Sequence, residues 1–387
     1  MKLLLLNYEY PPLGGGAGRA MQSIAEQLSE MGHDVNIITS HISFSHKNIV
    51  EKRIKIYFVP SLRKGIHDCG LRGALTYLFF AYFKLRRLSR QNQYDIIHYF
   101  FSLPTAFLSI LPGKHRRLPY IVSLRGSDVP RYDIYNRRLE LLHKVYLPVT
   151  RHIWKKAKSV VAVTNSLKQT ALQTNPNQSV NVIPNGIDIN IFSPGTDFKL
   201  NDDKFRLITV SRLIKRKGIQ NVLKALSEIN DSCISLTIIG EGNYENELKD
   251  MTAKLGLNSR VKFIGFCPRN DIPSYFWQSD AFILLSLAEA FGNVIAEAMA
   301  CGLPIIGANQ GGIPDLVSNE NGILVQSEDI EQIKSAIITM RDNKEMRIHM
   351  GKINAEKIAN KYNWKHIAEA YKEIYIKNLN GNNKKNK

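Results

Sequence analysis

The sequence is poor in cysteine, in acidic residues and in long apolar runs, and each shortage excludes a class of protein. The four cysteines are far apart, so they match neither a disulfide framework nor a zinc site. This spacing fits a protein of a reducing cytoplasm. The cysteines are Cys69, Cys233, Cys267 and Cys301.

No uninterrupted apolar stretch approaches the roughly 20 residues that a membrane-spanning helix needs. The first apolar run, residues 3–6, is soon followed by Glu9. It is too short for a signal peptide and is typical of a buried strand. Residues 94–112 are also apolar, but a proline and two polar residues interrupt them. We interpret this stretch as a strand, a loop and then a helix.

Acidic residues are clearly outnumbered, with 34 Asp and Glu against 52 Lys and Arg, a formal net charge of +18. Such an excess attracts anionic partners, of which nucleic acid and an anionic membrane are the two main classes. No helix-turn-helix, zinc finger or RNA-binding aromatic motif accompanies the charge. We therefore expect no nucleic-acid partner.

The densest basic segment, residues 62–90, combines aromatic and apolar residues with many cations. A basic amphipathic helix of this kind can lie in a membrane interface. The alternative is a core helix with a solvated basic end. A second basic segment covers residues 131–158. We expect a cytoplasmic protein that is peripheral to the inner face of the cell membrane and contacts anionic lipid through residues 62–90. The cations of that segment are Arg63, Lys64, Arg72, Lys84, Arg86, Arg87 and Arg90.

Short apolar runs alternate with helical patterns along the whole chain, which predicts parallel sheets with helices on both faces. Turn residues at 183–188 separate a first series of strands from a second. We predict an α/β protein with two doubly wound, Rossmann-like domains, residues 1–190 and 191–365. Residues 366–387 would form a helix that returns to the first domain and a basic tail. The predicted strands are 2–7, 35–39, 95–98, 120–124 and 159–163, then 206–210, 235–239, 261–264, 281–285 and 304–306.

Two acids, Glu289 and Glu297, flank a predicted helix start at Gly292 and Asn293. A helix N-terminus carries unpaired amides and partial positive charge, which suits a phosphate. Carboxylates accept hydrogen bonds from hydroxyl groups. Together these groups suit a sugar attached to a nucleoside diphosphate. In the alternative, one acid caps the helix and the other is solvated.

A basic loop, Ser211 to Gly218, follows the predicted strand 206–210 and contains four cations. Arginine can bind phosphate through two parallel hydrogen bonds, and lysine acts as a compact point charge. A departing pyrophosphate needs such countercharge. The alternative is a solvated turn, but ligands of these sheets bind beyond strand ends, which favours phosphate. The cations are Arg212, Lys215, Arg216 and Lys217.

Other loops carry weaker signals. The glycines at 14–18 suit a phosphate or a flexible turn, but Arg19 breaks the dinucleotide spacing and no Walker lysine follows. Arg125 and Asp128 follow strand 120–124 and either bind a substrate or pair with each other. His98 is either a cleft residue or a packed one. Asp315, after Gly311-Gly312, either closes on a donor or caps the next helix.

Together and in this order, the loops resemble those of the retaining glycosyltransferases of family 4. The resemblance covers nearly the whole chain. It implies the GT-B architecture, in which two Rossmann-like domains face a central cleft and bind acceptor and donor respectively. It implies transfer of a sugar from a UDP- or GDP-sugar to a glycan or lipid-linked acceptor in cell-envelope polysaccharide or lipopolysaccharide synthesis. The matching motifs are glycines 14–18, Asn185-Gly186-Ile187-Asp188, Ser211-Arg212 with Lys217-Gly218, Glu289 with Glu297, and Gly311-Gly312.

The resemblance also implies roles for residues. Arg212 and Lys217 would hold the donor diphosphate, and Glu289 would contact the transferred sugar; these three form the predicted catalytic group. Glu297 would bind the ribose. Residues 265–280 would shape the base pocket. The remaining donor contacts would be Gly15, Gly16, Phe291, Gly292 and Asn293, and the acceptor or cleft candidates are His98, Arg125 and Asp128.

One departure from the family pattern is Arg125, where many members carry histidine, so an acid–base role at that position is in doubt. No protein nucleophile is evident, which favours a same-face reaction assisted by the departing phosphate. We expect no metal and no cofactor, since the acids at 202 and 203 fall in the linker. The alternatives are a non-catalytic nucleotide-sugar-binding subunit of the same fold and a nucleotide-sugar epimerase.

Overall fold

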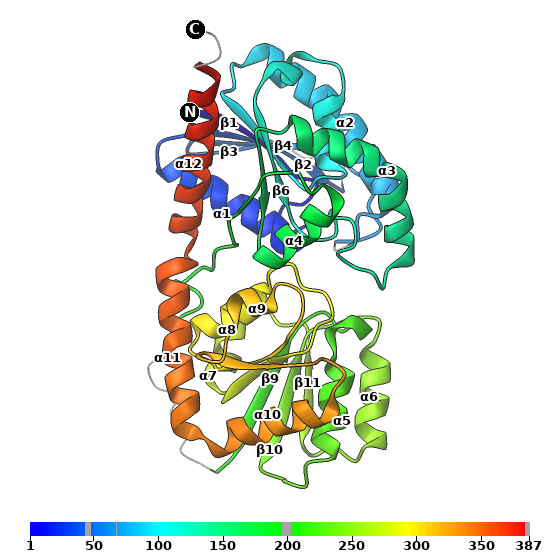
Figure 1. Ribbon diagram of the computed structural model, residues 1–387, viewed down its shortest axis with the longest axis vertical. Coiled ribbons are helices and arrows are strands. Elements are labelled where there is room, and N and C mark those ends of the chain that lie inside the picture. Colours follow the sequence, from blue (N-terminus) through cyan, green and yellow to red (C-terminus); the bar gives the residue numbers. More distant parts are fainter. Residues whose placement is uncertain (43–47, 67, 196–202, 384–387) are drawn as a thin grey trace. The chain divides into compact units, whose positions relative to one another are not determined.

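The computed structural model describes residues 1–42, 48–66, 68–195 and 203–383. The chain forms two compact units, each built around one sheet (Figure 1). Unit 1 contains Met1–Gly186 and Trp364–Lys387, and unit 2 contains Ile187–Asn363. Asp202 and the end of the basic tail lie outside the described residues.

Unit 1 has an eight-stranded sheet in the order β3-β4-β2-β1-β5-β6-β7-β8. All neighbours pair in parallel except β3, which is antiparallel to β4. The direction of the strand order reverses between β1 and β5. The strands are β1 (Lys2–Leu6), β2 (Asp34–His41), β3 (Ile49–Glu51), β4 (Ile54–Pro60), β5 (Ile96–Phe100), β6 (Tyr120–Leu124), β7 (Ser159–Ala162) and β8 (Val180–Val182).

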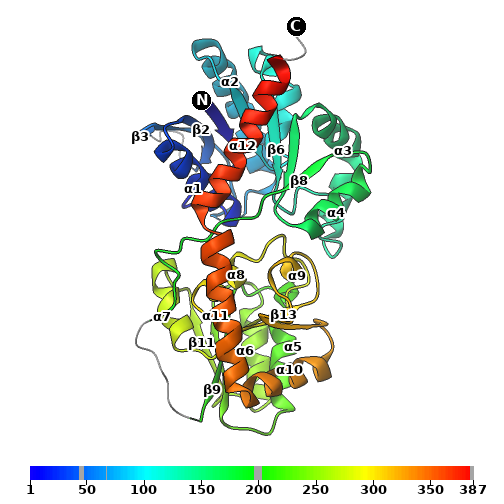
Figure 2. The ribbon, with the colours of Figure 1, turned by 60° about the vertical axis from the view of Figure 1, so that its left-hand side comes forward.

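The core of unit 1 is completed by the last helix of the chain, α12 (Trp364–Asn383), which packs against α1 (Gly16–Glu30) (Figure 2). Tyr371 and Tyr375 of α12 are fully buried in the same cluster as Met21 of α1. The remaining helices are α2 (Gly70–Gln91), α3 (Arg137–Lys156), α4 (Asn165–Thr174) and two 3-10 helices, η1 (Thr105–Ile110) and η2 (Lys114–Arg117). The helix expected near residue 110 is therefore a 3-10 helix.

Unit 2 has a fully parallel six-stranded sheet in the order β11-β10-β9-β12-β13-β14. Its order reverses between β9 and β12, which is the position where such sheets bind ligands. The strands are β9 (Phe205–Val210), β10 (Ile234–Ile239), β11 (Val261–Gly265), β12 (Ala281–Leu284), β13 (Ile305–Ala308) and β14 (Gly322–Val325).

The helices of unit 2 connect these strands in the usual alternation. They are η3 (Lys215–Lys217), α5 (Ile219–Ser227), α6 (Glu245–Lys254), η4 (Arg269–Asp271), α7 (Ile272–Trp277), α8 (Asn293–Ala300), α9 (Ile313–Leu316), α10 (Ile330–Asp342) and α11 (Lys344–Lys361). Together with unit 1, they confirm the predicted fold class, two doubly wound Rossmann-like sheets.

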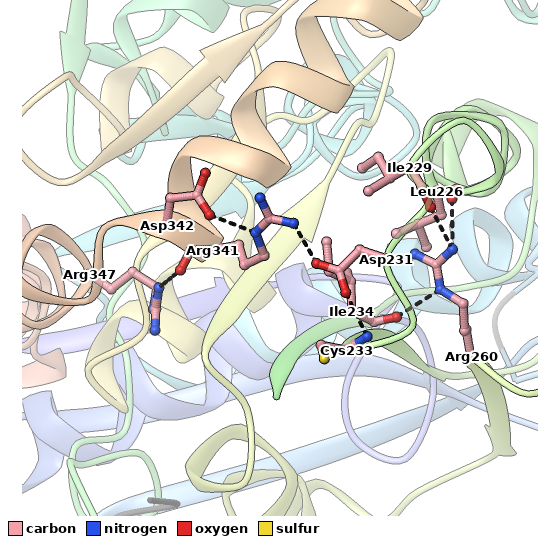
Figure 3. Close-up of polar contacts among 9 residues, drawn as sticks. All are labelled: Leu226, Ile229, Asp231, Cys233, Ile234, Arg260, Arg341, Asp342 and Arg347. Carbon is pink, nitrogen blue, oxygen red and sulfur yellow. Dashed lines mark hydrogen bonds and ion pairs between the residues drawn. The ribbon is translucent and has the colours of Figure 1, made fainter. Parts of the chain in front are cut away.

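A polar network ties the helices of unit 2 to the amino ends of β10 and β11 (Figure 3). Arg341, at the end of α10, pairs with Asp231 and with Asp342. Arg260 donates to three backbone oxygens, those of Leu226, Ile229 and Ile234. These charged residues stabilise the fold, because they lie at the edge of the sheet opposite to the carboxyl ends of the strands.

Within the described part of the chain, no helix is both long enough and apolar enough to cross a bilayer.

Candidate functional site

Two loops meet at the switch point of unit 2. One follows β9 and the other follows β12, and these strands are direct neighbours in the sheet, with Phe282 beside Ile208. The backbone N–H of Leu287 donates to the carbonyl oxygen of Arg216 at 2.8 Å, which links the two loops. The basic loop and the first acid of the sequence pattern therefore belong to one site.

Two glycines allow this close approach. Gly218 has φ +75°, and a Cβ there would lie 2.2 Å from the carbonyl oxygen of Leu285. Gly311 has φ +62°, and a Cβ there would lie 2.7 Å from the carbonyl oxygen of Glu289. The N–H of Gly312 donates to that same oxygen at 2.8 Å. The backbone of Glu289 is thus fixed from the loop after β13.

Lys217 and Glu289 form a hydrogen-bonded ion pair in this site. Their side chains are 11% and 15% exposed. Burial raises the pKa of Glu289, but the charge and hydrogen bond of Lys217, with help from Arg216 and Ser286, hold that pKa below its usual range. Glu289 is therefore ionised at neutral pH and suits the acceptance of hydrogen bonds rather than the donation of a proton.

Arg212 lies exposed at the start of the basic loop, whereas Leu213 is buried and anchors it. The N–H of Leu213 donates to the carbonyl oxygen of Glu241, in the loop after β10, at 2.9 Å. A Cβ at Gly240 would lie 1.9 Å from the oxygen of Ser211. Sequence reasoning missed this third loop, although its two glycines, 240 and 242, directly follow a predicted strand.

The helix α8 begins as predicted, with Gly292 (φ +91°) at its N-cap and no side-chain cap. The alternative in which Glu289 or Glu297 caps this helix is therefore wrong. Phe291 is buried just before the helix, and Asn293 is its first residue. The first turn leaves backbone N–H groups directed to the carboxyl edge of the sheet.

Glu297 has a partner of its own, Arg269 of η4. Its Oε1 accepts from Arg269 Nε at 3.1 Å and from Nη2 at 2.8 Å. The guanidinium group lies 4.7 Å from the ring centroid of Phe192. Sequence reasoning placed the base pocket at residues 265–280 but did not single out Arg269. The two acids thus have separate cations and separate positions.

Asp315 does not cap α9, because Gly312 is the N-cap and Asp315 lies inside the four-residue helix. The capping alternative for Asp315 is wrong. Among the described residues, no group of three or more His, Cys, Asp or Glu side chains is placed to hold a metal ion.

His98 is packed in the interior of unit 1. Its Nδ1 lies 2.8 Å from the hydroxyl of Tyr375 and its Nε2 lies 2.7 Å from the hydroxyl of Ser123. Burial, and then the charge of Arg125, lower its pKa well below the usual value. Of the two alternatives for His98, the structure has the packed residue.

The side chains of Arg125 and Asp128 do not form an ion pair, but the two residues pair through the backbone N–H of Arg125, which donates to Asp128 Oδ1 at 2.8 Å. Arg125 Nη1 donates to Asn185 Oδ1 at 2.7 Å, and Nη2 donates to the hydroxyl of Tyr371 at 3.3 Å. The carboxylate of Asp128 instead accepts from backbone N–H groups, including that of Ser102 at 2.6 Å. Burial raises the pKa of Asp128, and these hydrogen bonds oppose the rise. Both side chains brace the loops of unit 1.

The glycine loop of unit 1 leads into α1, with Gly15 at the N-cap and Gly16 as the first helical residue. The N–H of Gly15 donates to Glu9 Oε2 at 3.2 Å. A Cβ at Gly14 would lie 2.5 Å from the side chain of Glu9. A carboxylate of the chain itself therefore lies where the sequence pattern suggests a phosphate.

Two family models match the chain. Residues 14–191 match Glycosyltransferase Family 4, and residues 196–357 match Glycosyl transferases group 1. A relative from Escherichia coli, UDP-Gal:alpha-D-GlcNAc-diphosphoundecaprenol alpha-1,3-galactosyltransferase, is 26% identical and covers 97% of each chain.

Solved structures show the same fold. Sucrose-phosphate synthase from Thermosynechococcus elongatus has a TM-score of 0.83 and 20% identity, and covers 97% of this chain and 98% of its own. Anabaena HepE, solved in complex with UDP and glucose, has a TM-score of 0.71 and 22% identity, and covers 96% and 98%. The predicted resemblance is confirmed. The chain belongs to the group 1 glycosyl transferases of family 4, and is a retaining glycosyltransferase of the GT-B fold that uses a nucleotide sugar.

Proposed function

We propose that this enzyme transfers a sugar from a UDP- or GDP-sugar to a glycan or lipid-linked acceptor in the synthesis of cell-envelope polysaccharide or lipopolysaccharide. The observation that carries the proposal is the Lys217–Glu289 pair at the switch point of unit 2. The name of the Escherichia coli relative, with its UDP-sugar and its diphosphoundecaprenol acceptor, supports this class of donor and acceptor.

The donor diphosphate binds the cations of the basic loop. Arg212 is exposed and reaches the phosphates from solvent, while Lys217 already faces Glu289. When a diphosphate binds beside Lys217, the ammonium group of the lysine contacts both the phosphate and the carboxylate of Glu289. Phosphate oxygens also accept from the backbone of Gly292 and Asn293 at the start of α8.

The sugar and the ribose bind different acids. Glu289, ionised because of its low pKa, accepts hydrogen bonds from hydroxyl groups of the transferred sugar. Glu297, oriented by Arg269, accepts from the ribose. Each acid is held by its own cation, so the two contacts are independent of each other.

The chemistry is a same-face displacement. The bond from the sugar C1 to the phosphate oxygen breaks, the acceptor oxygen bonds to C1 from the same side, and the acceptor proton passes to the departing phosphate. Arg212 and Lys217 stabilise the negative charge that develops on that phosphate, a contribution worth about 10²–10³ in rate for one well-placed group. Glu289 acts as a sugar contact and not as the proton donor.

We also propose that α2 attaches unit 1 to the inner face of the cell membrane. Its inward face, with Tyr77 and Leu85, is buried against the sheet. Its outward face repeats every four residues and is more than half exposed. An exposed apolar stripe with arginines nearby is typical of an interfacial helix. The stripe is Leu71, Leu75, Phe79 and Phe83.

The test is to incubate the purified protein with UDP- and GDP-sugars and with glycan or lipid-diphosphate acceptors, and to identify products by mass spectrometry. Transfer to an acceptor supports the proposal. Donor binding, seen as a higher melting temperature, without transfer to any acceptor would instead indicate a binding subunit. Conversion of the donor into an isomer without acceptor would indicate an epimerase.

A further inference from the structure

The helix α3 exposes apolar side chains that a helix packed on a sheet usually buries. Leu141 and Val145 are 65% and 66% exposed. The opposite face is packed, with Ile153 and Trp154 fully buried. Exposed apolar patches on a folded unit mark binding surfaces more often than chance. The other exposed apolar residues of α3 and the loop before it are Ile134, Tyr135, Leu142 and Tyr146.

The exposed face of α3 carries cations at both ends, with Arg137 and Arg138 at its start. His152 and Lys156 lie at helical spacing from Leu141 and Val145, on the same side of α3, and are exposed. The apolar stripe of α2 is likewise followed by cations, Arg87 and Arg90.

Because α2 and α3 run in the same direction relative to the sheet, their cationic C-terminal ends lie at the same edge. The helix α2 follows β4 and α3 follows β6, so each starts at the carboxyl edge of the sheet and ends at its amino edge. Both apolar stripes therefore begin at the carboxyl edge, where sheets of this kind bind ligands. Both cationic C-terminal ends lie at the amino edge.

The cationic C-terminal ends converge on η2, a 3-10 helix made of Lys114, His115, Arg116 and Arg117. On one side, the hydroxyl of Tyr82 in α2 donates to the carbonyl oxygen of Pro112 at 2.9 Å, next to η2. On the other side, η2 and the end of α3 enclose a cavity of about 400 Å³.

Among the residues that the structure describes, five basic side chains and no acid line this cavity. The C-terminus of α3 carries only about half a negative charge, which two lysines at its end already offset. The helix dipole of α3 does not account for Arg116 and Arg117, because these arginines lie on η2. Between residues 61 and 160 there are nineteen Lys and Arg but only five Asp and Glu. The basic side chains of the cavity are Arg116, Arg117, His152, Lys156 and Lys158.

We propose that α3 is a second membrane-docking helix of unit 1, and that the basic cavity at its end binds the phosphate of an anionic lipid headgroup. The proposal rests on the membrane attachment proposed above for α2. A phosphate diester is complementary in charge to the basic side chains of the cavity, and lipid chains match the exposed Leu141 and Val145. A protein surface or a second copy of this strongly basic chain fits the charge less well.

The test is co-sedimentation of the full chain with vesicles of phosphatidylcholine, with or without phosphatidylglycerol. We expect Leu141→Ser with Val145→Ser to weaken binding to the anionic vesicles at least tenfold. We expect Arg116→Ser with Arg117→Ser to remove most of the preference for phosphatidylglycerol. Ile348→Ser is the matched control, because Ile348 is 65% exposed on α11 of unit 2 and should change nothing.

Three results would overturn the proposal. The first is that the α3 variant and the cavity variant both bind vesicles as the wild type does, whereas Phe79→Ser does not bind. In that case α2 alone would attach the protein to the membrane. The second is a dimer that the Leu141→Ser and Val145→Ser variant converts to a monomer in sedimentation velocity. The third is a rise in melting temperature with inorganic phosphate that needs Arg116 and Arg117, without vesicle binding. Donor binding by unit 2, measured in the same variants, separates these results from a failure of the proposed transferase function.

Discussion

Lys217 Nζ and the carboxylate of Glu289 form a partly buried ion pair across 72 residues of sequence, between loops that follow neighbouring strands. Each loop alone has only one sign of charge to offer a ligand. The pair provides both within one hydrogen bond, which suits a donor that combines phosphate with sugar hydroxyls.

We expect Lys217→Ala to lower kcat/KM for transfer by about 10²–10³, because the negative charge that develops on the departing phosphate loses a cation proposed to stabilise it. Lys224→Ala is the control, since Lys224 is exposed on α5, outside the basic loop. The measurement is release of nucleoside diphosphate at saturating acceptor. Equal rates for Lys217→Ala and the wild type would sink the assignment of Lys217.

The ion pair also predicts a dependence of stability on pH. The pKa of Glu289 is lowered in the folded protein, so its contribution is fully present above the unfolded pKa of about 4.3. That contribution is lost as pH falls through the lower, folded pKa. Urea denaturation from pH 3 to 7 should show this loss in the wild type and a smaller one in Glu289→Gln. Identical pH profiles for both proteins would contradict the shift.

The titration of His98 predicts a second dependence of stability on pH, at higher pH than that of Glu289. Its folded pKa lies well below the usual value, so folding favours the neutral imidazole. Its contribution is full above the unfolded pKa of about 6.5 and is lost as pH falls below that value. We expect His98→Gln to flatten the slope of the unfolding free energy between pH 6.5 and 5.

The same variant distinguishes packing from substrate contact. Because His98 is fully buried beside Ser123 and Tyr375, the acceptor KM of the folded fraction should not change. A large rise in acceptor KM at unchanged stability would show that His98 contacts the acceptor.

Gly218→Ala should destabilise unit 2 and abolish transfer, since the residue has φ +75° and the new Cβ meets the oxygen of Leu285. Gly256→Ala is the control, because Gly256 has φ +68° but open space around it. The control isolates the cost of the left-handed backbone, about 1–2 kcal/mol. We expect Gly218→Ala to cost more than this in thermal unfolding. Equal costs would mean that the loop moves freely away from Leu285.

Much of the fold follows from the sequence because its strands are short, apolar and separated by turn residues. The strands β9 and β10 lie within one residue of their predicted bounds. The start of α8 was predictable for a local reason, since Gly292 and Asn293 favour a turn into a helix. Such features depend on neighbouring residues along the chain.

The partners within the site depend instead on strand order, which no local pattern contains. The pairing of Glu297 with Arg269 requires η4 to pack beside α8, and Arg269 had no distinguishing signal in the sequence. Arg125 and Asp128 are close in sequence, yet their side chains are drawn to Asn185 and to backbone amides. An apolar periodicity likewise does not distinguish a buried helix face from an exposed one. For this reason the exposed apolar face of α3 was not predicted from the sequence.

The burial of α12 in unit 1 has a consequence for the order of folding during synthesis. Residues 1–186 leave the ribosome before unit 2, but their core lacks Tyr371 and Tyr375 until unit 2 has been translated. All of unit 2 must be translated in between, which takes on the order of ten seconds or more. During that time the part of α1 that packs against α12 has no cover. We therefore expect nascent unit 1 to depend on chaperones, whereas unit 2, continuous in sequence, can fold as soon as it emerges.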